Sequence, residues 1–251
     1  MNSDQSQIER VVALIKQAAP RVYALTGAGI STESGIPDFR SPGTGLWERV
    51  DPMEELSVTA LRRNPQRFYT FGMAQFTRYR DAQPNQAHLV LAQMEEAGYL
   101  AGVVTQNIDG LHQAAGSRQV FEVHGHLRTC RCLDCGGEFP YAQIEQNVAQ
   151  GIFPPQCVCG GTLRPNVVLF GDSMPKDYVL AVRALHNCDL LLVVGSSLEV
   201  SPANTLPNLA RRVVIVNLTP THFDQHADVV INDKASKVFM DIWARLIHQS
   251  C

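Results

Sequence analysis

Short runs of apolar residues recur along this chain, and stretches with helical periodicity separate them. Runs that are apolar throughout, without polar alternation, are typical of strands buried on both faces of a sheet. The pattern predicts strands at residues 21–25, 99–104, 190–194, 213–217 and, more weakly, 228–231. Because helical stretches separate these strands, the expected fold class is α/β, with a doubly wound, mostly parallel, Rossmann-like sheet.

The separating stretches place their apolar residues on one helical face. In the first of them Ile8, Val11 and Ile15 share such a face. The pattern predicts helices at residues 4–18, 67–80, 84–97, 176–186 and 235–248. Pro84 suits the first turn of its helix, and Gly98 is placed to end that helix.

One region interrupts this alternation. From Leu127 to Leu163 the periodicity fades, and Cys, Gly and Pro become frequent. We therefore expect a small module at residues 127–163, inserted into a larger domain made of residues 1–126 and 164–251. The main sheet is expected to resume near Val167.

Composition excludes several classes of protein. The chain has 251 residues, of which 45% are hydrophobic and 18% charged, which excludes a disordered chain, a collagen-like repeat and a disulfide-framed miniprotein. With 21 basic and 24 acidic residues, the net charge of −3 argues against binding nucleic acid through bulk charge. The N-terminus lacks the pattern of an export signal, and the longest apolar run, Leu190–Val194, is too short to cross a bilayer. We expect a soluble, cytoplasmic protein that does not engage membranes.

Most of the seven cysteines are clustered between Cys130 and Cys159. A Cys-x-x-Cys pair and a Cys-x-Cys pair are each followed by Gly-Gly, and two such turns can bring four thiolates around one zinc ion. The predicted ligands are Cys132, Cys135, Cys157 and Cys159, with Cys130 as an alternative to Cys132. Four sulfur ligands leave no open position for water, so this zinc is expected to be structural.

A loop with two glycines, Gly27-Ala28-Gly29, follows the first predicted strand. Glycines at this position allow the backbone to approach a pyrophosphate closely. The dehydrogenase version of the motif has a third glycine, where this chain has Thr32, and an acidic residue at the end of the next strand, about 20 residues on. Residues 37–53 carry no strand pattern. The sequence therefore argues against simple hydride transfer.

Polar motifs follow further predicted strands, on the side of an α/β sheet where ligands usually bind. The motifs are Gly35-Ile-Pro-Asp-Phe-Arg40, Thr105-Gln-Asn-Ile-Asp-Gly-Leu-His112, Glu122-Val-His-Gly125, Val194-Gly-Ser-Ser-Leu198 and Val216-Asn-Leu218. Their guanidinium can neutralise phosphate, and their amides and carboxylate can recognise a carboxamide, a ribose and a water.

In this order the motifs GAGIST, GIPDFR, TQNIDGLH, HG, the paired cysteines and GSSLEVSPA resemble those of the sirtuin family of NAD-dependent protein deacylases, over about residues 8–245. The resemblance implies that the larger domain holds NAD, that the zinc module packs beside it, and that an acetylated lysine of a protein or peptide substrate lies in the cleft between them. In this family the acyl oxygen attacks the ribose carbon that bears nicotinamide, and the acyl group leaves on ADP-ribose. The implied cofactors are NAD and one structural Zn²⁺.

The resemblance also implies roles for single residues. His124 would be the general base, Asn107 would order a water or a ribose hydroxyl, and Asp109 would receive the nicotinamide carboxamide. Phe39 would shield the reactive carbon. The cofactor would be lined by Gly27, Ala28, Gly29, Thr32, Phe39, Arg40, Gln106, Asn107, Ile108, Asp109, Gly195, Ser196, Ser197, Asn217, Leu218 and Ala235.

A substrate strand and an acyl pocket are implied as well. The residues matching the strand that pairs with the substrate backbone are Val167, Val168, Phe170 and Gly171. Family members that prefer succinyl or malonyl groups carry a Tyr and an Arg three residues apart in a helix lining the acyl pocket. Tyr69 matches the tyrosine, whereas Gly72 stands at the arginine position. Without that cation a carboxylate-bearing acyl group lacks its partner, so a neutral group, acetyl first, is expected.

Two other functions are compatible with these residues. The same NAD site would serve a protein ADP-ribosyltransferase, which also breaks the bond to nicotinamide. A zinc-ribbon module that binds protein or nucleic acid without chemistry is disfavoured by the negative net charge and by the polar strand ends. No exposed apolar stripe is evident in the sequence, so a monomer is expected.

Overall fold

The computed structural model describes residues 3–38 and 51–248. Its strands are β1 (Val22–Thr26), β2 (Gly102–Thr105), β3 (Val120–Glu122), β4 (Gly125–Cys132), β5 (Glu138–Pro140), β6 (Leu163–Val167), β7 (Leu190–Val194), β8 (Val213–Val216) and β9 (Val229–Ile231). Its α-helices are α1 (Ser3–Ala18), α2 (Pro52–Glu55), α3 (Val58–Arg63), α4 (Pro65–Arg67), α5 (Ala74–Thr77), α6 (Gln86–Glu96), α7 (Leu111–Ala114), α8 (Ala142–Ala149), α9 (Lys176–Leu185) and α10 (Ala235–His248). Three 3-10 helices, η1 (Ala28–Ser34), η4 (Ala203–Leu209) and η5 (Asp224–His226), and one π-helical turn, η3 (Phe68–Gly72), complete the set.

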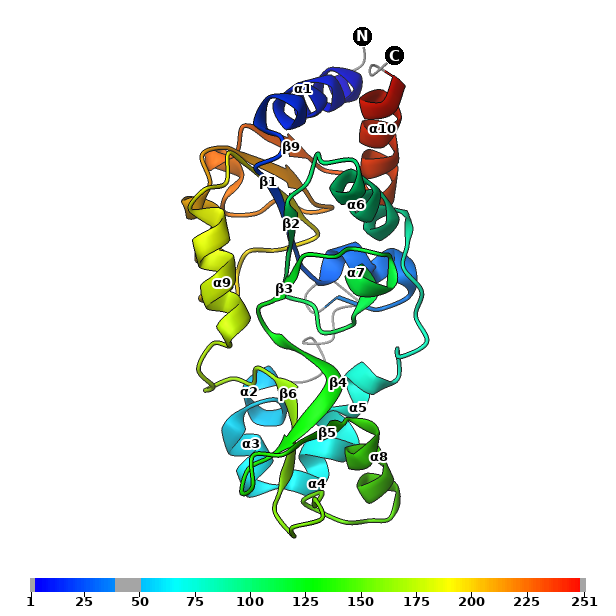
Figure 1. Ribbon diagram of the computed structural model, residues 1–251, viewed down its shortest axis with the longest axis vertical. Helices are drawn as coiled ribbons and strands as arrows, with labels where there is room; N and C mark the ends of the chain where they lie inside the picture. The colour runs from blue at the N-terminus through cyan, green and yellow to red at the C-terminus, as the bar shows by residue number, and fades with distance from the viewer. Residues whose placement is uncertain (1–2, 39–50, 249–251) are drawn as a thin grey trace.

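A six-stranded sheet in the order β3-β2-β1-β7-β8-β9 organises one end of the molecule (Figure 1). All neighbouring strands in it run parallel. Every residue of β2, β7 and β8 is buried, as the wholly apolar runs predict. The order reverses between β1 and β7, and ligands of such sheets bind outside the carboxyl ends of the strands at that point. The predicted parallel α/β sheet is confirmed.

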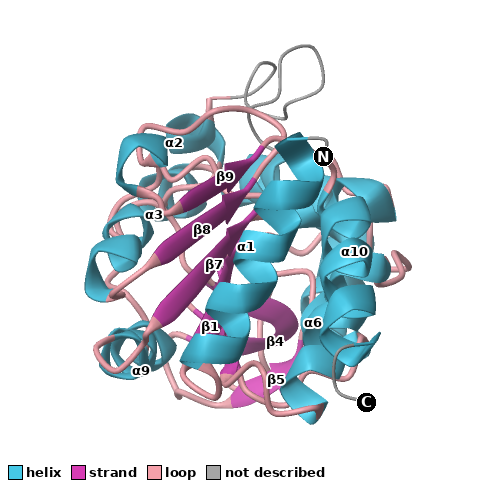
Figure 2. Cartoon of the chain, turned by 90° about the horizontal axis from the view of Figure 1, so that it is seen from above, coloured by secondary structure: helices cyan, strands magenta, loops and turns pink. Residues whose placement is uncertain are grey.

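Helices cover both faces of this sheet (Figure 2). The helices α1, α6 and α10 pack their apolar residues against one face, and α9 and η4 cover the other. The helices predicted at residues 4–18, 84–97, 176–186 and 235–248 are confirmed as α1, α6, α9 and α10. Pro84 lies before the first turn of α6, because Asn85 caps that helix by accepting from the Ala87 amide at 3.0 Å. Gly98 ends α6 with a φ of 79°. No described helix has both the length and the apolar character that crossing a membrane requires.

A second sheet lies at the other end of the molecule (Figure 1). It has three antiparallel strands in the order β5-β4-β6. The prediction that the main sheet resumes near Val167 is wrong, because Val167 ends β6 and pairs with Gly125 of β4 in this smaller sheet. Of the apolar run at residues 167–170 only Val167 belongs to β6, and the sequence does not reveal which strand will be the partner of β6.

Short helices from an earlier part of the chain complete the core of the smaller sheet. Leu61 of α3 and Phe68 of η3 belong to the same buried cluster as Ile144 of α8 and Leu163 of β6. We call residues 51–77 together with 125–172 the small part, and the other described residues the large part. The predicted module at residues 127–163 therefore omits residues 51–77, which pack into the same core.

The single helix predicted at residues 67–80 is broken into α4, η3 and α5. The break is a wider turn, in which the Met73 amide donates to the Phe68 carbonyl at 2.8 Å. Gly72 lies in this turn, where an added Cβ would stand 2.7 Å from the carbonyl oxygen of Glu55. The turn thus lets the chain pack closely against α2, a contact that helical periodicity alone cannot predict.

Candidate active site

The carboxyl ends of β1, β2 and β7 open into a cavity of about 1190 Å³, lined by residues of both parts. The strand register places Thr26 beside Thr105 on one side and Val194 on the other. The three loops that follow therefore begin at the same level of the sheet. Each of the strand-end motifs contributes described residues to the lining of this cavity.

Glycines allow two of these loops to touch. The Gly29 amide donates to the Gly195 carbonyl at 2.8 Å. Gly195 has a φ of 61°, and a Cβ added to it would lie 2.2 Å from the amide nitrogen of Ile30. No other residue type fits this contact without displacing the backbone. The backbone of the first loop is thereby fixed at the edge of the cavity, as a site for a pyrophosphate requires.

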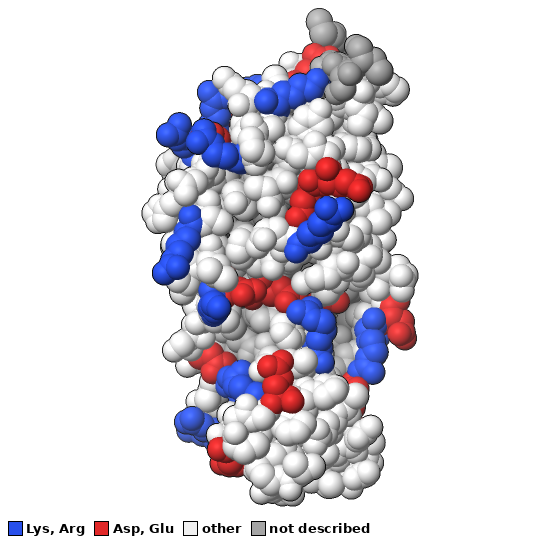
Figure 3. Space-filling view, in the orientation of Figure 1, with Lys and Arg blue, Asp and Glu red and all other residues white. Residues whose placement is uncertain are grey.

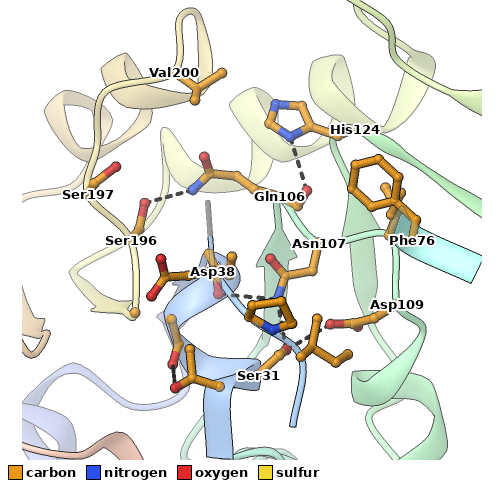
Figure 4. A pocket seen from close by; sticks show the side chains of 18 of the residues that line it. Ser31, Asp38, Phe76, Gln106, Asn107, Asp109, His124, Ser196, Ser197 and Val200 are labelled. Carbon is orange, nitrogen blue, oxygen red and sulfur yellow. Dashed lines mark hydrogen bonds between the residues drawn. The ribbon is translucent and has the colours of Figure 1, made fainter. Parts of the chain in front are cut away.

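A buried polar cluster joins the first loop to the motif after β2 (Figure 4). Ser31 donates to Asp109 at 2.7 Å, and the Asn107 amide group donates to the Gly27 carbonyl at 3.1 Å and to the Ser31 hydroxyl at 3.2 Å. Burial raises the pKa of Asp109, while hydrogen bonds from the Leu111 amide and from Ser31 partly offset that effect. The cluster holds an amide and a carboxyl group in fixed positions. The sequence prediction left Ser31 out, although it stands in the same glycine loop.

Gln106 links the ends of β2 and β7 across β1. Its side-chain amide donates to the Ser196 hydroxyl at 2.9 Å, and that hydroxyl also accepts from the Leu198 amide at 3.3 Å. Its main-chain amide donates to the Thr26 carbonyl at 3.0 Å. These hydrogen bonds fix the side chains of Gln106 and Ser196, both of which line the cavity.

His124 lies where the two parts of the molecule meet. Its Nδ1 is 3.0 Å from the Gln106 carbonyl oxygen. A carbonyl can only accept, so the neutral ring carries its proton on Nδ1 and keeps a lone pair on Nε2. Burial lowers the pKa of His124, and the bond to Gln106 only partly opposes this effect. His124 is therefore neutral near pH 7 and suited to accept a proton.

A second histidine, His112, is linked to Asn107 through the hydroxyl groups of Thr26 and Thr105. His112 Nε2 lies 2.9 Å from the Thr26 hydroxyl, which donates to the Thr105 hydroxyl at 2.8 Å. The Thr105 hydroxyl accepts in turn from the main-chain amide of Asn107 at 3.1 Å. His112 is 1% exposed and its ring lies 4.8 Å from that of His88. The sequence assigned His112 no role, although it closes the motif that contains Asn107.

The predicted site residues gather around one cavity, with few exceptions. Those that line it are Gly27, Ala28, Gly29, Thr32, Gln106, Asn107, Ile108, Asp109, His124, Val167, Val168, Phe170, Gly171, Gly195, Ser196, Ser197, Asn217, Leu218 and Ala235. Phe39 and Arg40 lie outside the described residues. Asp38, Phe76 and Val200 also line the cavity (Figure 4); Asp38 and Val200 stand in the GIPDFR and GSSLEVSPA motifs, whereas Phe76 was not predicted.

Tyr69 is the predicted residue that the structure does not bring to the cavity. It is 4% exposed, and its hydroxyl donates to the Leu163 carbonyl at 2.8 Å within the core of the small part. Its assignment to an acyl pocket is therefore wrong. Met73 and Phe76, which follow in the same stretch, line the cavity instead. The break in the predicted helix changes which side chains face inward.

The four predicted zinc ligands come together in the small part. Their Sγ atoms all lie within 4.8 Å of one another, and the shorter Sγ–Sγ distances run from 2.8 to 3.9 Å. A tetrahedral zinc with Zn–S bonds of about 2.3 Å separates its sulfur atoms by about 3.8 Å. Four thiolates of this spacing fit one zinc ion and leave no position for water. The cysteines are Cys132, Cys135, Cys157 and Cys159.

Two neighbouring residues explain the shape of this cluster. A Cβ added to Gly161 would lie 2.6 Å from the Cys132 Sγ, so glycine lets the two cysteine turns meet. Cys130 is fully buried, with its Sγ 3.6 Å from the Pro140 carbonyl oxygen, and it is not a member of the group. The alternative in which Cys130 replaces Cys132 is therefore not the one that the structure has.

Comparison with known proteins identifies the family to which this chain belongs. The sequence profile of the Sir2 family matches residues 27–202. NAD-dependent protein deacetylase 2 of Caldanaerobacter subterraneus subsp. tengcongensis is 50% identical over 241 residues, which are 96% of each chain. NAD-dependent protein deacetylase 1 of Geobacillus kaustophilus is 46% identical over 222 residues, which are 86% of this chain and 89% of the relative.

Solved structures agree with the sequence matches. A structure solved for the mechanism and regulation of Sir2 enzymes has a TM-score of 0.88 and 38% identity, covering 98% of this chain and 99% of its own. A Sir2 variant with deacetylated p53 peptide and 3'-O-acetyl ADP ribose has a TM-score of 0.89 and 33% identity, covering 95% and 98%. A Sir2 complex with p53 peptide and NAD⁺ has a TM-score of 0.85 and 33% identity, covering 97% and 98%.

Proposed function

This chain belongs to the Sir2 family, and we propose that it removes acetyl groups from protein lysine side chains in a reaction that consumes NAD. The products are nicotinamide, the free lysine and O-acetyl-ADP-ribose. Support comes from the names of relatives that match nearly the whole chain and from a Sir2 structure that holds deacetylated peptide with acetyl ADP ribose.

The observation that carries this proposal is the position of His124. Its ring is oriented by the Gln106 carbonyl at 3.0 Å, and its own carbonyl accepts from the Val168 amide at 2.9 Å. One residue thus contacts both the strand-end loops and the segment proposed to bind the peptide. With its pKa lowered by burial and its Nε2 lone pair available, His124 acts as the general base on a ribose hydroxyl.

We assign the two sides of the cavity to the two substrates. NAD binds against the loops after β1, β2, β7 and β8, where Asn107 and Asp109 are held by Ser31. When bound, NAD supplies a ribose carbon whose bond to nicotinamide can be broken. The acetylated peptide pairs with residues 167–171, which line the cavity from the small part. The four cysteines hold a structural zinc at the other end of β6, where Cys132 pairs with Leu163.

We still propose a preference for a neutral acyl group, but the support comes from residues other than Tyr69. Met73 and Phe76 line the cavity with apolar surface. Among the described residues, the arginines that line the cavity are Arg80 and Arg128, and they are paired with Glu145 and Glu122 respectively. A succinyl carboxylate would have to compete with these glutamates for its cation, whereas an acetyl group needs none.

The test is nicotinamide release from NAD by the purified protein, with an acetylated lysine peptide and with the same peptide unacetylated. We expect release that depends on the acetyl group and equals the amount of free lysine formed. His124→Ala should lower kcat by about 10²- to 10⁴-fold. His186→Ala, which changes an exposed histidine directly after α9 that does not line the cavity, is the matched control and should retain full turnover.

The same experiment separates deacetylation from ADP-ribosyl transfer. With labelled NAD, a transferase would label protein in the absence of any acetylated peptide. Labelling of that kind at the rate of nicotinamide release would replace our proposal with the transferase. A faster reaction on succinylated than on acetylated peptide would overturn the acyl preference alone.

We further propose that the protein is a cytoplasmic monomer that binds no nucleic acid. On the face shown in Figure 3, basic and acidic side chains are interspersed, which supports this view because nucleic acid favours a continuous basic surface. Light scattering on the purified protein measures the mass directly, and a mass of two chains would contradict the monomer.

A further inference from the structure

The segment proposed to bind the peptide is shaped by a buried ion pair that the proposed chemistry does not use. Arg164 of β6 donates from two nitrogens to the two carboxylate oxygens of Asp172, at 3.0 and 2.7 Å. The Arg164 side chain is 6% exposed and that of Asp172 is 18% exposed. Two parallel bonds of this kind fix the relative orientation of the two groups as well as their distance.

This pair also forms hydrogen bonds with the backbone at both ends of the segment. Arg164 donates to the Val167 carbonyl at 3.1 Å, where the segment begins. The Asp172 carboxylate accepts from the Leu169 amide at 2.9 Å, and the Asp172 amide donates to the Leu169 carbonyl at 2.9 Å. The turn at residues 169–172 is thus closed by a charged side chain.

The remaining contacts hold the segment between its neighbours. The Val168 amide donates to the His124 carbonyl, and the Phe170 amide donates to the Leu56 carbonyl at 3.1 Å. The side chain of Leu169 is 4% exposed and packs in the core of the small part. The ion pair adds bonds at Val167 and at the turn, where Gly171 is exposed with a φ of 92°.

Stability alone gives a weak reason for such a pair. Removing two charges from water is costly, and apolar residues of similar volume often stabilise a core as well or better. Although burial disfavours the charge of Asp172, hydrogen bonds from Arg164 and from the Leu169 amide hold the pKa of Asp172 below its ordinary value. The carboxylate therefore stays charged, and its bonds to the turn persist, throughout the neutral range.

We propose that Arg164 and Asp172 are positioning residues that hold residues 168–171 in the conformation which pairs with the acetylated peptide. This inference rests on the proposed function, because it assigns that segment to the peptide. A segment that is already held in its binding conformation spares the cost of ordering it when the peptide binds. Loss of the pair should therefore weaken peptide binding in the ground state and the transition state alike, which raises KM for peptide and leaves kcat little changed.

The experiment measures KM for acetylated peptide, KM for NAD and kcat in wild type and in Asp172→Asn. We expect KM for peptide to rise about tenfold or more, with kcat and KM for NAD within about twofold of wild type. Asp172→Glu restores the carboxylate and should recover most of the lost affinity. Asp189→Asn is the matched control, because Asp189 is paired with Arg21, is 19% exposed and lies at the opposite end of the main sheet.

Equal increases in both KM values, or a loss confined to kcat, would overturn the positioning role. Should Asp172→Asn fail to fold, Arg164→Lys is used in its place, because it replaces the two-pronged guanidinium by a single ammonium group. It should likewise raise KM for peptide far more than KM for NAD. Wild-type turnover is the separate test of the proposed function. If wild type shows none, fluorescence anisotropy with a labelled acetyl-lysine peptide still compares wild type and variant, and equal affinity or no binding to either overturns the inference.

Discussion

The large and small parts of this molecule are held together in different ways. In the large part, strands such as β7 are buried at every position, and two apolar clusters fill both faces of one parallel sheet. In the small part, β5 has two exposed residues of three, and the core is completed by short helices from elsewhere in the chain. Four cysteines and the Arg164–Asp172 pair add specific bonds there.

This difference corresponds to the roles proposed for the two parts, which bind different substrates in the cavity. Apolar burial makes a rigid sheet whose strand ends carry the proposed NAD site. The small part contributes the proposed peptide segment, and its shape depends on few, directional interactions. We therefore expect the two parts to lose their structure under different conditions.

Removal of zinc should have the largest effect and should act on the small part. Binding of a structural zinc supplies about 10 kcal/mol or more. A chelator should abolish turnover and speed hydrogen exchange at the Leu163 amide, while the amides of Val104 and Val193 in the main sheet stay protected. Equal loss of protection in both parts would show that they fold as one unit.

Single cysteine variants sharpen that prediction. Cys132→Ala should lose the bound zinc, measured as metal per chain by mass spectrometry. Cys130→Ala should keep one zinc per chain, because the Cys130 thiol is buried two residues away but is not a member of the cluster. Zinc loss in Cys130→Ala instead would contradict the ligand set.

Gly195→Ala should damage the large part without touching the metal. The new Cβ would lie 2.2 Å from the Ile30 nitrogen, so the two loops must separate. We expect a loss of about 3 kcal/mol in unfolding free energy and weaker binding of NAD. Gly98→Ala is the matched control, since Gly98 also has a positive φ but no atom within 4 Å of the added Cβ, and it should cost only about 1 kcal/mol.

Acid should destabilise the large part through its buried histidines. Burial lowers the pKa of His88 to about 4 in the folded protein, whereas the unfolded value is about 6.5. Below pH 6.5 the unfolded chain binds the extra proton, so stability is full above that pH and falls until about pH 4, by up to about 3 kcal/mol. Urea unfolding of His88→Gln between pH 7 and 4 should show a shallower loss, and His186→Gln should behave as wild type.

The smallest effect concerns the pH dependence of turnover. Because burial lowers the pKa of His124, the acid limb of kcat/KM should have its midpoint below 6.5, with activity rising as pH increases through it. A midpoint above 6.5 would mean that the site stabilises the charged form of His124 and would contradict the lowered pKa. Initial rates at saturating NAD, from pH 5 to 8, measure this limb.

Sequence reasoning succeeded where structure depends on neighbours along the chain. The strands at residues 190–194 and 213–217 could be read from continuous apolar runs, and their ends marked the cavity because parallel strands finish on one side of a sheet. It failed for Val167 and Tyr69. The residues of β6 do not reveal which strand β6 will pair with, and the direction of the Tyr69 side chain depends on a turn that is fixed by contact with α2.

Periodicity and motif spacing are local properties of the chain, and they are enough to predict the α/β sheet, the four cysteines and the motifs whose residues line the cavity. The pairing of β6 with β4, the place of residues 51–77 in the small part, and the support that Ser31, His112 and the Arg164–Asp172 pair give to the site are visible only in the folded structure. These features join residues far apart in the chain, and burial and hydrogen-bond partners of that kind exist only once the chain has folded.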